Sequence, residues 1–99
     1  MTRVTLKECD GRYSVACVGH ATGSCEVCAA VSTLVYTLLG WLKNADGVAL
    51  EKEEIADGYA EIEFSGADEA RVAFELISIG LLQIAAAKSN FLEVFSEKF

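Results

Sequence analysis

The chain has 99 residues, of which 53% are hydrophobic, and it contains no proline. This length is enough for one hydrophobic core but not for two, so we predict a single domain over residues 1–99. Eight basic residues against 15 acidic ones give a net charge of -7. Because affinity for phosphates needs grouped lysine and arginine, and the basic residues here are scattered, direct nucleic-acid binding is disfavoured.

The sequence favours a cytoplasmic protein without a membrane span. Residues 1–8 alternate polar and apolar and lack the long apolar run of a secretory signal. The uncharged stretch 27–42 is shorter than the roughly 20 apolar residues of a spanning helix, so we expect a buried helix there. Structural disulfides are uncommon in a reducing compartment, which leaves core thiols, metal ligands or nucleophiles as the roles open to Cys9, Cys17, Cys25 and Cys28.

The first half of the chain predicts a β-hairpin followed by a helix. Strand-like segments over residues 4–7 and 13–18 flank Asp10-Gly11, a dipeptide favoured in hairpin turns because both positions tolerate positive φ. From residue 24 to residue 42 apolar side chains recur at steps of three and four, which is a helical period. Its expected N-cap is Ser24.

The second half repeats this plan. Asp57-Gly58 marks a hairpin turn within residues 48–64, and a helical stripe covers residues 67–88 with Ser65 as its expected cap. Gly80 is interpreted as a point where the two helices approach closely. We therefore predict an α+β two-layer sandwich, in which a four-stranded antiparallel sheet carries both helices on one face in the order ββα-ββα.

The helices carry more apolar surface than one sheet face can cover, which predicts a homodimer. The side chains beyond the main stripe of the first helix are Val35, Tyr36, Leu39 and Trp41. The alternative is that these side chains pack under the C-terminal segment. That segment has phenylalanines at steps of four, and three roles are open to them, namely extending the core, covering a dimer or mimicking a substrate: Phe91, Phe95 and Phe99.

His20 is the only histidine of the chain. It lies eight residues before Cys28, which is near the start of the first predicted helix. Helix N-termini stabilise thiolates, because unpaired backbone N–H groups and the helix dipole favour negative charge. A nearby imidazole can accept the thiol proton and later protonate a leaving amine, and the Cys28 amide is a candidate oxyanion donor. On these residues alone, a lone histidine near a cysteine is more often structural, which here means a buried Cys28 beside a polar loop histidine.

The amino-acid sequence around His20 and Cys28 resembles that of one protein family. Gly19-His20-Ala21, a short loop and the run Val27-Cys28-Ala29-Ala30-Val31-Ser32 are similar to the signature of the ribosomal-processing cysteine proteases called Prp. The resemblance implies a cysteine endopeptidase with His20 and Cys28 as its catalytic pair and Gly19, Ala29 and Ser32 as supporting residues. It also implies a homodimer that removes the N-terminal extension of a large-subunit ribosomal protein, with no cofactor or metal.

The sequence departs from the family pattern at two points. Many members place an aspartate three residues before the nucleophile, where this chain has Cys25, and many have a longer loop before it. Glu26 is not assigned the missing role, because it projects from another face of the helix. For Ser32 the alternative is a hydrogen bond back to its own helix. The acidic surface, with Glu26, Glu51, Glu53, Glu54, Asp57, Glu61 and Glu63 as candidates, would attract a basic ribosomal protein.

Two other functions use the same cysteines. Cys25-Glu26-Val27-Cys28 is a Cys-x-x-Cys sequence, which occurs in thiol redox sites, and a reversible Cys25–Cys28 disulfide could also switch a peptidase off. A small zinc module would use four ligands of suitable type, which are Cys17, His20, Cys25 and Cys28. The two predicted hairpins argue against the parallel sheet of a thioredoxin, and Cys17 fits a strand core.

Overall fold

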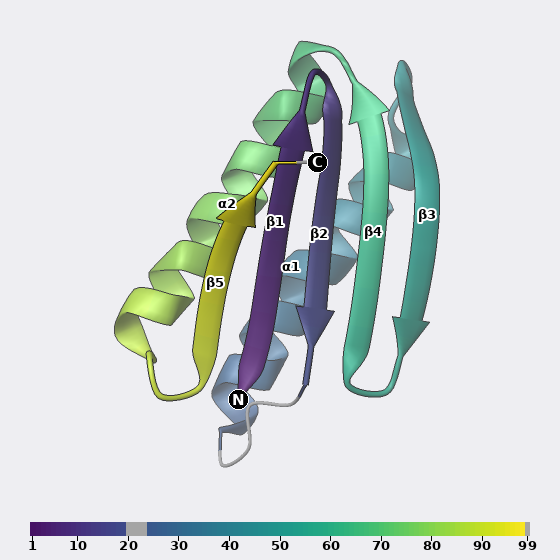
Figure 1. The fold of residues 1–99 in the computed structure, drawn as a ribbon. Helices are drawn as coiled ribbons and strands as arrows, with labels where there is room; N and C mark the ends of the chain where they lie inside the picture. Colours follow the sequence, from purple (N-terminus) through teal and green to yellow (C-terminus); the bar gives the residue numbers. More distant parts are fainter. Residues whose placement is uncertain (20–23, 99) are drawn as a thin grey trace.

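The structure, a computed structural model, describes residues 1–19 and 24–98 (Figure 1). Five strands form one sheet, and both helices lie on the same face of it, so the predicted α+β sandwich is confirmed. In chain order the elements are β1 (Thr2–Cys9), β2 (Arg12–Val18), α1 (Cys25–Asn44), β3 (Val48–Ala56), β4 (Tyr59–Gly66), α2 (Asp68–Ala87) and β5 (Leu92–Glu97).

The sheet has the strand order β3-β4-β2-β1-β5. The two hairpins join through antiparallel pairing of β2 with β4, in a register that sets Val18 opposite Tyr59. β5 is a fifth strand that the sequence analysis missed, and it pairs parallel to β1. The sheet is therefore mixed and five-stranded, where we predicted four antiparallel strands.

The spacing of the C-terminal phenylalanines explains why the fifth strand was not predicted from the sequence. A spacing of four residues is typical of a helix. The strand period is instead carried by Leu92 and Val94, which face inward and alternate with Glu93 and Phe95, which face outward. Leu92 is 1% exposed and Phe95 is 47% exposed. Phe91 packs against the core just before β5, and Phe99 lies outside the described residues.

Both predicted hairpin turns are present. Asp10 and Gly11 have φ values of 45° and 83°, and Gly58 has a φ of 72°, which is the left-handed region that Asp and Gly tolerate best. The predicted Ser24 cap of α1 is also confirmed, because its Oγ accepts a hydrogen bond from the Val27 amide. The Ser65 cap is wrong: β4 continues through Ser65, and α2 begins after Ala67 without a side-chain cap.

The core fills the space between the helices and the sheet. Val35 and Leu39, which we expected to project beyond it, are buried, whereas Tyr36 is 58% and Trp41 37% exposed. Gly80 brings α2 close to Leu34 of α1, as interpreted from the sequence. Both helices have the length and apolar content of a membrane span, yet each packs one side on the sheet, as core helices of globular proteins do.

Two glycine variants test this packing. Gly66→Ala should lower the free energy of unfolding by about 1–3 kcal/mol, since a Cβ there would lie 2.8 Å from the Ala70 Cβ and 3.1 Å from a Val48 methyl. Gly40→Ala is the matched control, because apart from its chain neighbours and the backbone of its own helix no atom lies within 4 Å of its Cβ position, and alanine gains about 1 kcal/mol inside a helix. Urea unfolding measures both; equal effects would contradict the packing described.

Candidate active site

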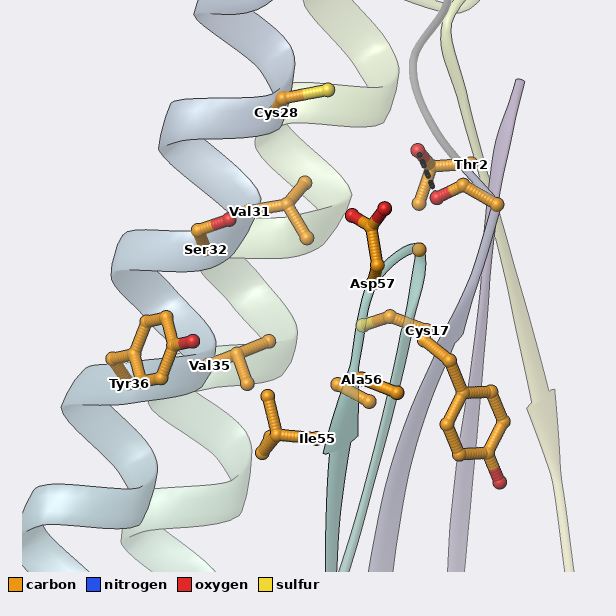
Figure 2. Close-up of a pocket in the computed structure, with 14 residues that line it drawn as sticks. Thr2, Cys17, Cys28, Val31, Ser32, Val35, Tyr36, Ile55, Ala56 and Asp57 are labelled. Atoms are coloured by element: carbon orange, nitrogen blue, oxygen red, sulfur yellow. Dashed lines mark hydrogen bonds between the residues drawn. The ribbon is translucent and has the colours of Figure 1, made fainter.

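A pocket of about 490 Å³ opens between the first turns of α1 and the turn that joins β3 to β4 (Figure 2). One wall belongs to α1, which contributes Cys28, Val31, Ser32, Val35 and Tyr36. The other walls come from the β3–β4 hairpin, residues 55–60, and from the neighbouring ends of β1 and β2 through Thr2, Cys17 and Gly19. The pocket is therefore built from both halves of the chain.

Cys28 owes its place to the start of α1. Ser24 caps the helix, and the apolar stripe that begins with Val27 (2% exposed) and Val31 (7%) seats this end on the core. Cys28 follows Val27 directly, packs partly against the core and lies on the pocket wall. Its thiol is thus held near the positive end of a helix of 20 residues.

The Cys28 amide is not a free oxyanion donor in this structure. It donates to the Ser24 carbonyl over 3.3 Å, while the Val27 amide donates to the Ser24 Oγ over 3.3 Å. The reason is the position of Cys28 in the helix. Its amide makes the first i to i−4 hydrogen bond of α1, because the acceptor is the carbonyl of the N-cap residue Ser24. Ser32 offers a hydroxyl instead, one turn further along the same wall.

Gly19 holds the end of β2 at the rim of the pocket. Its amide donates to the Gly58 carbonyl over 2.8 Å, and its own carbonyl accepts from Thr2 Oγ1 over 3.3 Å. Its φ is 92°, and a Cβ here would lie 2.7 Å from the Met1 carbonyl oxygen, so only glycine fits. His20, the next residue, lies outside the described residues.

The other residues singled out from the sequence divide into two groups. Ser32 lines the pocket, whereas the hydroxyl groups of Thr33 and Thr37 donate to carbonyl groups of α1 four residues earlier. Ala29 and Cys25 are exposed and do not line it. Glu26 turns toward α2, where its carboxylate lies 3.9 Å from the Lys88 ammonium.

The thiols differ in environment. Burial raises the pKa of Cys17 to about 11, so this side chain is a protonated core thiol at neutral pH. Cys28 is half-buried at the pocket and Cys25 is exposed. Within residues 1–19 and 24–98, no three His, Cys, Asp or Glu side chains come together as a metal site.

Sequence reasoning missed the wall opposite Cys28. Ile55 and Asp57 reach the pocket because β4 pairs with β2, which sets the β3–β4 turn beside the end of β2. Thr2 reaches it from β1, which pairs with the other edge of β2. The sequence analysis recognised Asp57 as a turn residue and as a candidate for the acidic surface, but not as a residue of this pocket. The alternation of polar and apolar residues in each strand could be recognised in the sequence, but the order of the strands in the sheet could not be predicted from it.

A half-buried thiol at a helix start, facing an open pocket, is the arrangement of a cysteine-dependent enzyme. The family model of the cysteine protease Prp matches residues 1–93. The chain therefore belongs to the Prp family of cysteine proteases, which confirms the resemblance noted in its sequence. No curated protein matched.

Solved structures share the fold over nearly the full chain. The ribosomal processing protease Prp from S. aureus, in complex with a covalently linked product peptide, has a TM-score of 0.85 and 19% identity, covering 98% of this chain and 100% of that one. The same protease with a substrate peptide has a TM-score of 0.80 and 18% identity, with the same coverage. SMU.848 from Streptococcus mutans has a TM-score of 0.75 and 28% identity, covering 100% of this chain and 96% of that one.

Thiol labelling tests the described environments. With iodoacetamide at pH 8, the exposed Cys25 should be alkylated readily, whereas Cys17 should remain largely unmodified until the protein unfolds. A thiol of pKa about 11 has only about one molecule in a thousand ionised at that pH, and the thiolate is the reactive form. Peptide mapping by mass spectrometry gives the extents; labelling of Cys17 at the rate of Cys25 would contradict its burial.

Proposed function

We propose that this protease is an endopeptidase that removes the N-terminal extension of a large-subunit ribosomal protein, with Cys28 as nucleophile and His20 as general acid and base. The observation that carries the proposal is the placement of Cys28 and Gly19 on one pocket, since Gly19 leads directly into His20. The S. aureus relative, a ribosomal processing protease, supports the choice of substrate. A ribosomal substrate also fits a cytoplasmic location.

The reaction is acyl transfer through a thioester. His20 takes the proton of Cys28, and the thiolate attacks the scissile carbonyl carbon to give a tetrahedral oxyanion. The C–N bond then breaks as the His20 imidazolium gives its proton to the departing amine. Water, deprotonated by His20, hydrolyses the thioester and restores the thiol. The Ser32 hydroxyl is proposed to support the oxyanion from the same wall of the pocket.

The apolar walls favour a hydrophobic side chain of the substrate next to the scissile bond. Val31 and Val35 line the pocket from α1, and Ile55 lines it from the β3–β4 hairpin (Figure 2). Such a site excludes water from the bound side chain and holds the peptide beside the thiol. An aromatic or aliphatic residue at that place is therefore the expected specificity.

Electrostatic steering by the acidic surface is weaker than the net charge suggests. Of the carboxylates considered, Glu26 lies near Lys88, Glu53 binds Lys43, and Glu61 and Glu63 share Lys52. The two one-to-one pairs have little net charge at a distance, and the Lys52 group keeps a single net negative charge, so these carboxylates attract a basic partner weakly. We retain steering as a contribution of the overall charge to the association rate.

Cleavage of a peptide spanning the extension of the host's ribosomal protein tests the function. The wild-type protein should cut it at one site, and Cys28→Ala or His20→Ala should lower kcat/KM by about 10³-fold or more, because the nucleophile and its base act as a unit. Cys25→Ser is the matched control and should keep its activity. Cleavage by the Cys28→Ala protein, or none by the wild type, would overturn the proposal.

The same assay addresses the redox readings. In a peptidase that Cys25 does not regulate, activity is equal with and without a thiol reductant. A loss of activity without reductant that Cys25→Ser abolishes supports the reversible disulfide. Reductase activity without peptide cleavage would favour the thiol redox function instead.

We further propose that the protease is a homodimer joined through its helices. An apolar groove between α1 and α2 is lined by Leu38, Trp41, Val72, Leu76 and Ile77. Leu76 is 63% exposed in the isolated chain, and burying such side chains against a second copy removes apolar surface from water.

A lysine in this groove should separate the protomers. Leu76→Lys should raise the dimer Kd by tenfold or more, since an unpaired charge in an apolar interface costs more than about 1.4 kcal/mol. Phe95→Lys, on exposed β5, is the control and should remain dimeric. Analytical ultracentrifugation measures both; a monomeric wild type, or dissociation by the control alone, would contradict the groove as the interface.

A further inference from the structure

We propose that the free edge of β3 binds the peptide substrate as an added strand and leads it along α1 to Cys28. The inference rests on the proposed peptidase function and deepens it, because it names the backbone groups that hold the substrate. It also gives the bound segment a pattern, in which apolar and basic side chains alternate. The sheet order, the direction of the backbone groups of β3 and the charges along this strand support it.

The first feature is the position of β3 in the sheet. β3 is an edge strand, and among the described residues only β4 pairs with it (Figure 1). An edge strand keeps one row of backbone N–H and C=O groups that an extended peptide can bind. The opposite edge strand, β5, contributes no described residue to the pocket, whereas β3 ends there with Ile55 and Ala56. Of the two edges, β3 is therefore the one that leads into the pocket.

The turn between β3 and β4 fixes the direction of the backbone groups. The Gly19 amide of β2's end donates to the Gly58 carbonyl. Within a trans peptide the N–H that follows a carbonyl points the opposite way, so the Tyr59 N–H points away from β2 and toward β3. Its register partner on β3 is Ala56. The backbone groups of Ala56 are thus used within the hairpin.

Backbone groups alternate in direction along β3. Hydrogen-bonded and non-hydrogen-bonded pairs alternate in an antiparallel ladder, so Glu54, like Ala56, directs its N–H and C=O toward β4. Ile55 and Glu53 fall between these residues and direct theirs outward, at the free edge. Together they offer four groups at the two-residue repeat of an extended peptide.

The pocket has the length of a short extended segment. Tyr36 lies eight residues beyond Cys28 on α1, which is about 12 Å along the helix, and both line the pocket. An extended peptide covers this distance in roughly four residues. Figure 2 shows Ile55 at the level of Tyr36. A peptide paired with Ile55 therefore reaches the Cys28 thiol about four residues further along.

The two faces of β3 give the bound peptide its alternating pattern. A peptide residue opposite Ile55 shares its face of the sheet, so its side chain enters the apolar pocket. The next peptide residue lies beside Glu54, which is exposed on the other face with Glu61 as its register partner. Lys52 binds Glu61, so one negative charge remains at this place for a basic side chain of the peptide.

A second copy of β3 is the rival occupant of this edge, and the charges oppose it. β3 carries Glu51, Glu53 and Glu54 against a single lysine. Two copies paired edge to edge would bring these carboxylates together, and like charges opposite one another destabilise a sheet. A basic peptide is stabilised by the same charges. The edge therefore fits the substrate better than a second protomer.

Amide hydrogen exchange of the Cys28→Ala protein tests the edge directly. The probes are a peptide spanning the extension of the host's ribosomal protein and an acetylated octapeptide that alternates phenylalanine and lysine. Without peptide the Glu53 and Ile55 amides should exchange fast, and bound peptide should slow them about tenfold or more, while the Glu54 amide is slow throughout. Protection of the two amides without peptide, or none with either probe at millimolar concentration, overturns the proposal.

Glu53→Pro compared with Glu53→Ala separates the backbone amide from the side chain. Both variants lose the carboxylate and its ion pair with Lys43, but only proline removes the outward N–H, at an edge position where proline is tolerated. Calorimetry should give Glu53→Pro a peptide Kd about tenfold above that of Glu53→Ala. Equal Kd values overturn the pairing.

N-methylation of the peptide gives the same test without altering the protein. Affinity should fall when every second residue is methylated and should hold at the residues between, because alternate N–H groups of an added strand face β3. An effect that is independent of position overturns the pairing.

The two probes also distinguish this inference from the proposed function. If the octapeptide protects the edge but the wild-type protein cuts no ribosomal peptide, the proposed substrate fails and the edge site is supported. If the ribosomal peptide is cut while the Glu53 and Ile55 amides stay unprotected, the edge site fails and the proposed function is supported.

Discussion

The site depends on how the apolar stripe of α1 seats on the sheet. Val27, Val31 and Val35 are each at most 7% exposed, and their burial fixes both the rotation and the height of the helix. Cys28 and Ser32 follow the first two of these valines, so they stand at the edge of the buried stripe and face the pocket. The energy that orients the thiol is therefore hydrophobic, and it is supplied by residues that take no part in the chemistry.

Local signals were readable from the sequence because they depend on near neighbours. The helical period, the Ser24 cap and the Asp-Gly turns follow from local sterics and hydrogen bonding, and each is present. The catalytic candidates came from a short motif. β5, the mixed sheet and the pairing of β2 with β4 depend on contacts between distant segments, so the wall that holds Asp57 was not predictable.

The two halves of the chain contribute unlike parts to one site. The first half supplies the thiol, the helix dipole and the glycine before His20, all within residues 19–32. The second half supplies Ile55 and Asp57 from a hairpin turn. Joining them is the β2–β4 pairing, which forms the centre of the sheet. Loss of that pairing would separate the nucleophile from its facing wall while leaving each half with its own secondary structure.

The parallel pairing of β5 with β1 also sets an order for folding on the ribosome. β1 pairs with β2 as soon as the first hairpin has emerged, yet its other edge waits for residues 92–97. A parallel pair between opposite ends of the chain carries a large loop-closure cost and forms late. During synthesis this edge is open to other strands, and the charges of Arg3, Lys7 and Glu8 along β1 reduce the risk of aggregation until β5 arrives.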